Sequence, residues 1–121
     1  MRRRQFITLL GVTLFAGTNQ SLVGGSGDDV LIGAPGDTLT GGGGSNTFVF
    51  NPGFGKETIK GFTAGQDVIA FDHTLFTSPS QVLNQAHDSK AGAVIVVDAH
   101  DTVTLIGVHV AQLQSSDFHL F

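Results

Sequence analysis

Residues 24–49 read GGSGDDVLI (24–32), GAPGDTLT (33–40) and GGGGSNTFV (41–49), three glycine-rich units in tandem. Thirteen of the 17 glycines lie between Gly24 and Gly65. In each unit, the glycines precede an acidic or amide residue, and a large apolar residue follows it. The second unit is one residue short, and the third has Asn46 where the first has Asp29. Self-similarity at a short fixed period is typical of repeat architectures, so this period decides the fold.

The pattern continues beyond residue 49 in a decayed form, as PGFGKETIK (52–60) and GFTAGQDVI (61–69). Glycine permits the positive φ of a tight turn, and the middle one of the three extended residues that follow would point inward. The predicted inward side chains are all large and apolar: Leu31, Leu39, Phe48, Ile59 and Ile69. Two units would form one coil of about 18 residues, so alternate units would stack on the same side.

These units resemble the nonapeptide G-G-x-G-x-D-x-U-x of RTX (haemolysin-type) calcium-binding proteins, where U is a large apolar residue. Residues 48–69 also resemble the end of such an array in serralysin-type and related secreted bacterial proteins. The resemblance implies an all-β protein, with a short parallel β-roll over residues 23–71 and a small β-rich C-terminal cap over residues 72–121. It further implies a secreted, extracellular bacterial protein that binds calcium ions and whose folding is coupled to Ca2+.

Stacking of the first unit on the third would bring oxygen ligands together between neighbouring turns. Ca2+ favours six to eight oxygens, whereas Mg2+ needs a tighter octahedron and Zn2+ prefers nitrogen or sulfur. The predicted calcium ligands are side chains or backbone carbonyls of Gly24, Ser26, Asp28, Asp29, Gly42, Gly44 and Asn46. Asp37 is the predicted ligand of a second site on the opposite side, where Glu57 would be its partner.

Other interpretations of the glycines and acids stay open. The string of glycines at 41–44 could form a flexible linker. A phosphate-binding loop is disfavoured, because neither Gly-Lys-Ser/Thr nor a helical pattern follows. Exposure in solvated turns is the simplest expectation for three of the acidic residues: Glu57, Asp67 and Asp72.

The amino-acid composition excludes some kinds of metal site and of binding partner. The 121 residues fit one domain, and the absence of cysteine excludes disulfides and thiolate metal sites. From residue 21 onward, three lysines stand against all ten acidic residues, a net charge of −7. A protein this acidic repels the phosphate backbone of a nucleic acid. We therefore expect no nucleic-acid partner.

Residues 1–20 read MRRRQFITLLGVTLFAGTNQ, a basic start followed by about a dozen mostly apolar residues. This run is too short for a stable membrane span and has the form of an export signal. Residues 3–7, RRQFI, resemble the twin-arginine export signal. We expect residues 1–20 to lie outside the fold; an amphipathic tail or a misassigned gene start is the alternative.

The C-terminal half predicts four short elements. Ser78-Pro79-Ser80-Gln81 fits a helix start. The β-branched runs 93–97 and 102–106 predict a hairpin, and residues 110–114 a helical turn. Residues 117–121, DFHLF, resemble the signal that type I secretion machinery reads in RTX families, and they also fit a last strand that packs its phenylalanines. Type I secretion needs an unfolded chain, whereas twin-arginine export carries folded proteins, so the two routes are alternatives.

The sequence predicts no enzyme. Its histidines, scattered without ligand spacing, are His73, His87, His100, His109 and His119. No nucleophile elbow is present, and serralysin-type proteases carry catalysis in a separate upstream domain. The alternative to calcium binding is a non-catalytic structural or adhesion scaffold with decayed metal sites, or a remnant of a larger RTX exoprotein. An exposed end of the roll could pair with a second copy of the chain, which would give a homodimer.

Overall fold

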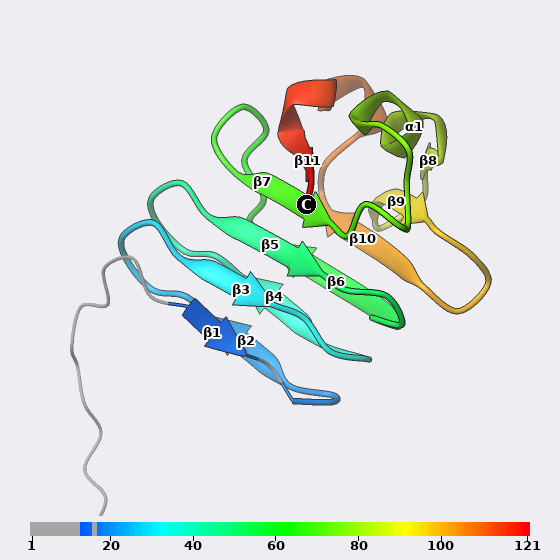
Figure 1. Cartoon of the computed structure of the whole chain (residues 1–121). Helices are drawn as coiled ribbons and strands as arrows, with labels where there is room; N and C mark the ends of the chain where they lie inside the picture. Colours follow the sequence, from blue (N-terminus) through cyan, green and yellow to red (C-terminus); the bar gives the residue numbers. More distant parts are fainter. Residues whose placement is uncertain (1–12, 16) are drawn as a thin grey trace, which may run out of the picture.

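A computed structural model describes residues 13–15 and 17–121, which form two sheets of short strands (Figure 1). The repeat region contains seven strands: β1 (Thr13–Phe15), β2 (Ser21–Val23), β3 (Val30–Ile32), β4 (Thr38–Thr40), β5 (Thr47–Phe50), β6 (Lys56–Lys60) and β7 (Val68–Phe71). The predicted all-β class is confirmed. The twin-arginine-like motif and most of the apolar run after it lie outside the described residues.

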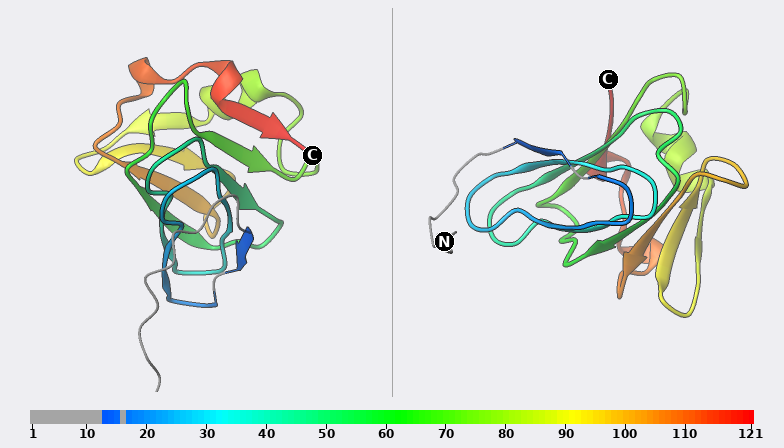
Figure 2. Two further views of the ribbon diagram at one scale, coloured as in Figure 1. Left: turned by 90° about the vertical axis from the view of Figure 1, so that its left-hand side faces the viewer. Right: turned by 90° about the horizontal axis from the view of Figure 1, so that it is seen from below.

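Consecutive strands of this region lie in opposite sheets, and each strand from β1 to β5 pairs in parallel with the strand two positions further along the chain. One sheet has the order β1-β3-β5-β7-β11, and the other has the order β2-β4-β6-β10-β9-β8. Figure 2 shows the chain winding as a flattened coil with turns along its two sides. The predicted short parallel β-roll is therefore the architecture of this region.

The length of each coil follows the defects of its units. Leu31 pairs with Phe48 at a separation of 17 residues, one fewer than an ideal coil because the second unit lacks a residue. Leu39 pairs with Ile59 at 20 residues, and Phe48 pairs with Ile69 at 21 residues. The turns absorb these differences, so the strands keep their register.

The interior of the roll is formed by the five side chains that the period predicts to point inward. Each of them has no exposed surface: Leu31, Leu39, Phe48, Ile59 and Ile69. Burial of one such side chain contributes about 1.5–3 kcal/mol. The repeat therefore supplies a continuous apolar core between the two sheets.

The roll begins earlier than the sequence predicted. Strand β1 pairs in parallel with β3, and the Asn19 N–H donates to Pro35 O at 2.9 Å. The expectation that residues 1–20 lie outside the fold is therefore wrong for the described residues before residue 21. Strands β1 and β2 each have a leucine at the middle position, as β3 and β4 do, but the turn between them, at residues 17–20, lacks the glycine-acid pattern that marks the repeat.

The cap extends both sheets. Strands β9 (Gly92–Val96) and β10 (Thr102–Ile106) form the predicted antiparallel hairpin, and β10 pairs in parallel with β6. Strand β11 (Phe118–Leu120) pairs in parallel with β7, while β8 (Ala86–Asp88) forms the outer edge beside β9. The last two strands of the roll are thus covered by strands from much later in the chain.

Short helical segments close the cap. Helix α1 (Pro79–Asn84) begins as predicted, because Ser78 Oγ accepts the Gln81 N–H at 3.2 Å. The helical turn predicted at 110–114 is a 3-10 turn, η1 (Val110–Gln112), and a second one, η2 (Ser115–Asp117), precedes β11. Within the described part of the chain, no helix has the length and apolar character that crossing a membrane requires.

A group of phenylalanines joins the roll to the cap. The ring of Phe50 lies 5.0 Å from that of Phe54 and 5.7 Å from that of Phe71, centroid to centroid. Phe71 in turn meets Phe76 edge-on at 4.9 Å. Tilted aromatic pairs at such distances add to the energy of burial, so this cluster fixes the cap on the last coil.

Candidate metal centre

The turns at 24–29 and 41–46 stack directly on one another, as the repeat predicted. The Gly43 N–H donates to Gly25 O at 3.0 Å, and the Ser45 N–H donates to Asp28 Oδ1 at 2.7 Å. The Asp29 N–H donates to the Asn46 side-chain oxygen at 2.9 Å. Three of the predicted ligand side chains, Asp28, Asp29 and Asn46, therefore lie in one pair of turns.

Glycine is required where these turns approach each other. A Cβ on Gly24 would lie 2.6 Å from both Asp29 Oδ2 and Gly41 O. Gly42 and Gly44 have φ angles of +84° and +79°, and a Cβ on them would collide with the carbonyl oxygens of Gly25 and Gly27. Oxygens are the polar atoms that crowd these glycines most closely, and oxygen is the ligand that Ca2+ prefers.

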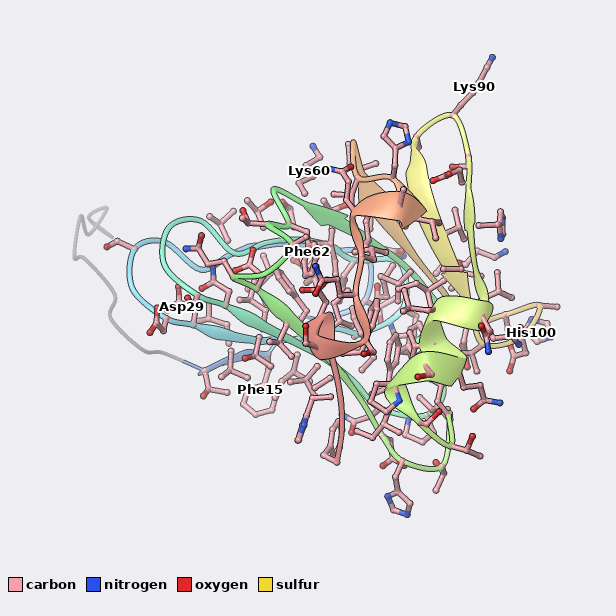
Figure 3. All side chains as sticks on the ribbon, turned by 90° about the horizontal axis from the view of Figure 1, so that it is seen from above. Phe15, Asp29, Lys60, Phe62, Lys90 and His100 are labelled. Atoms are coloured by element: carbon pink, nitrogen blue, oxygen red, sulfur yellow. The ribbon has the colours of Figure 1, made fainter. Side chains whose placement is uncertain are left out.

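The side chains of this turn pair differ in exposure. Asp29 and Asn46 are buried, whereas Asp28 and Ser26 are exposed. Figure 3 shows Asp29 beside the turns of the first coils, at the opposite side of the molecule from His100 in the cap. In residue type and placement, this turn pair fits a calcium ion.

On the opposite side of the roll, the predicted ligand Asp37 accepts hydrogen bonds from backbone N–H groups. Asp37 Oδ1 accepts the Gln20 N–H and Asp37 Oδ2 accepts the Ala34 N–H, both at 2.7 Å, so both oxygens are occupied. The Asp37 N–H in turn donates to Glu57 Oε1 at 2.8 Å. Asp37 therefore joins neighbouring turns through backbone donors, and a second calcium site there stays a prediction.

Glu57 has an unusual environment. It is buried, and its Oε2 has no hydrogen-bond partner among the described residues, where it lies against Gly33 and the Phe50 ring. Burial raises the pKa of Glu57 to about 8, and the nearby charge of Asp37 adds to this rise. With no cation beside it, Glu57 is thus mainly protonated at neutral pH.

Two further carboxylates continue the column of Asp29 and Asn46. Asp67 Oδ1 accepts the Asn46 N–H and Asp67 Oδ2 accepts the Thr63 N–H, both at 2.8 Å. Asp117 likewise accepts two N–H groups at 2.8 Å, one from Gly65 in the roll and one from Gln114. These side chains hold successive turns together by satisfying backbone donors that the turns leave unpaired.

The expectation of solvated turns is wrong for Asp67 and Glu57, which are buried. Asp72 partly meets the expectation of a solvated turn, because its carboxylate is only half-buried. It accepts the Thr74 hydroxyl at 2.6 Å, and the hydrogen bonds from Thr74 lower its pKa. Asp117 was singled out only as part of the C-terminal signal. The position of Asp67 at the end of a decayed unit, 21 residues after Asn46, was the signal that could have identified it.

Over the whole described part of the chain, the turns at 24–46 included, no group of three or more His, Cys, Asp or Glu side chains could hold a metal ion, and no pocket is found there. The five histidines are exposed.

Comparison with known proteins identifies the relatives of this fold. Residues 15–120 match the family described as peptidase M10 serralysin C terminal. No curated protein matches the chain. The matched span covers both the β-roll and the cap.

Proposed function

The chain belongs to the serralysin C-terminal family of peptidase M10, and on that premise we propose that it is a non-catalytic, exported β-roll module that binds Ca2+ at one pair of turns. The stacking of residues 24–29 on residues 41–46 is the observation that carries this proposal. It gathers two aspartates and several backbone carbonyls where glycines leave room for them.

The residues that would hold the ion are Asp28, Asp29 and the neighbouring backbone carbonyls. The bound ion would supply positive charge between acidic turns. With a dissociation constant of about 0.1 mM and about 1 mM Ca2+ outside the cell, mass action gives roughly 1.4 kcal/mol for one site. That is a modest fraction of the stability of a domain, so calcium would adjust the stability of this fold rather than create the fold.

The contacts between the turns support the same conclusion. Backbone N–H groups of several turns are already satisfied by side-chain oxygens, as at Asp37 and Asp67. A roll whose turns are held in this way can form without metal. This observation also favours a second candidate function, a structural scaffold that needs no calcium.

Export from a bacterial cell is the part of the proposal that rests on the family and on the two terminal motifs. If type I machinery reads residues 117–121, the double variant Arg3→Lys with Arg4→Lys still reaches the medium. Loss of that variant from the medium would instead favour the twin-arginine route.

Circular dichroism of the full chain during thermal unfolding separates the two candidate functions. We expect β signal in chelator, and a rise in Tm of about 5 °C with millimolar Ca2+ that Mg2+ does not reproduce. Asp29→Asn should abolish the rise, whereas the control Asp72→Asn should retain it. A Tm that Ca2+ leaves unchanged would contradict calcium binding and favour the structural scaffold.

A further inference from the structure

We propose that Asn46 sets how strongly the roll depends on calcium: its neutral amide joins the turns at 24–29 and 41–46 as a bound cation would. This inference rests on the proposed function, because it concerns the same pair of turns. It adds that the residue at position 46 decides whether the turns need an ion at all.

The amide of Asn46 is held at both ends. Its oxygen accepts the Asp29 N–H at 2.9 Å, and its nitrogen donates to Gly43 O at 3.2 Å. The direction of these bonds fixes the orientation of the amide, since an N–H donor must face the oxygen. The side chain is buried, so both contacts are shielded from water.

The corresponding side chain of the first unit occupies the same place in its own turn. Asp29 Oδ2 lies over Gly24, where a Cβ would approach it to 2.6 Å. Asn46 Nδ2 lies over Gly41 in the same way, at 2.5 Å from such a Cβ. At this position the two turns therefore differ in one group: a carboxylate oxygen in the first is replaced by an N–H donor in the second.

The turn around Asn46 presents a carbonyl where the other turns present an N–H. At Asp67, the second carboxylate oxygen accepts the Thr63 N–H, and at Asp117 it accepts the Gln114 N–H. At Asn46, the facing group is Gly43 O, because the Gly43 N–H is already used across the turns by Gly25 O. An amide satisfies this position, and a carboxylate does not.

Aspartate at position 46 would change the electrostatics of the turn pair. Its second oxygen would face Gly43 O at about 3 Å, two acceptors without a proton between them, close to Asp29 and Asp67. Two oxygens at that separation can share one Ca2+ at its usual distance of about 2.4 Å. The same site would then require the cation that the Asn46 amide replaces.

The test compares Asn46→Asp with Asn51→Asp, the same substitution in an exposed turn outside the column. We expect Asn46→Asp to lose about 10 °C in Tm in chelator and to recover most of it in about 10 mM Ca2+. Its calcium-induced rise should be at least about twice that of the wild type, with tighter Ca2+ binding by calorimetry. Asn51→Asp should behave as the wild type in both conditions.

The outcomes distinguish this inference from the proposed function. If the wild type responds to Ca2+ and Asn46→Asp responds no more strongly, the role of Asn46 is overturned and the proposed function stands. If only Asn46→Asp responds, the proposed function fails and the role of Asn46 stands. Failure of Asn46→Asp to fold in Ca2+ would also overturn the inference.

Asn46→Ala separates the amide from the cavity it fills. Alanine provides neither the N–H nor a ligand, so this variant should lose the same stability with and without Ca2+. A calcium-induced recovery of Asn46→Ala would contradict the assigned role.

Discussion

Glu57 is an ionisable side chain buried in the roll. Its Oε1 is bound to the Asp37 N–H, while its Oε2 is buried beside Phe50. Its pKa rises to about 8, from 4.5 in the unfolded chain. Between these two pH values the folded protein holds a proton that the unfolded chain has released.

Stability should therefore fall as the pH rises, with the full contribution of Glu57 present below pH 4.5 and lost once the pH passes about 8. Glu57→Gln keeps an oxygen for the Asp37 N–H and stays neutral, so it should remove this decline. At pH 8.5 we expect the variant to exceed the wild type by about 2 kcal/mol in the free energy of unfolding, and to match it near pH 4.5.

Denaturant unfolding at a series of pH values measures this difference. Asp72→Asn is the control, because the pKa of Asp72 is lowered and its effect falls at acidic pH. A constant difference between Glu57→Gln and the wild type from pH 4.5 to 8.5 would exclude the titration of Glu57 as its cause.

The turns and strands of the roll place different demands on their residues. The strands need one inward apolar side chain each, and the period identified all five from Leu31 to Ile69. The turns depend on the direction of each peptide group, which spacing does not reveal. This is why the sequence predicted the meeting of Asp29 with Asn46 but missed the roles of Asp67 and Glu57 as acceptors of backbone N–H groups.

The turn between β4 and β5 contains two neighbouring glycines, of which one has room for a side chain and the other does not. Gly42 has a φ of +84° and no room for a Cβ, because Gly25 O lies against it. Gly43 has open space around its Cα and no positive φ. Gly42→Ala should cost about 2–3 kcal/mol, whereas Gly43→Ala should stay within about 0.5 kcal/mol of the wild type.

Chemical denaturation of the two variants tests this contrast directly. Equal losses at the two positions would show that the run at 41–44 acts as a flexible linker rather than as a closely packed turn.

Among the described residues, the roll has one open end and one covered end (Figure 1). At the open end, Phe15 and Val23 are 74% and 58% exposed, whereas β6 and β7 are covered by β10 and β11. Strands β1 and β2 carry no charged side chain that would oppose pairing. A homodimer through this end stays a prediction, which the mass in solution would test.

Because each coil of a roll contacts mainly its neighbours, stability should vary along the axis. Hydrogen exchange followed by mass spectrometry should show the fastest exchange in β1 and β2 and the slowest in β5, β7 and β10. Exchange at one rate in all strands would instead indicate a single cooperative unit, or an open end covered by a second copy.

The first coil also marks the limit of sequence-based prediction. Strand β1 lies in the apolar run that resembles an export signal, and no glycine-acid turn joins it to β2, so the sequence places residues 13–15 and 17–20 outside the fold. Strands β1 and β2 join the roll because they pair with β3 and β4, whose residues lie 17 positions later in the sequence. Local composition favoured one structure, and tertiary pairing decided another.

The order in which the residues leave the ribosome gives the covered end a further meaning. Strand β7 ends at Phe71, but its neighbour β11 begins only at Phe118. At a synthesis rate of about 10 residues per second, roughly 5 s separate the two strands, and more while the last residues stay in the exit tunnel. During that interval β7 has no neighbour on its cap side, so the nascent chain cannot complete this sheet until β11 has been synthesised.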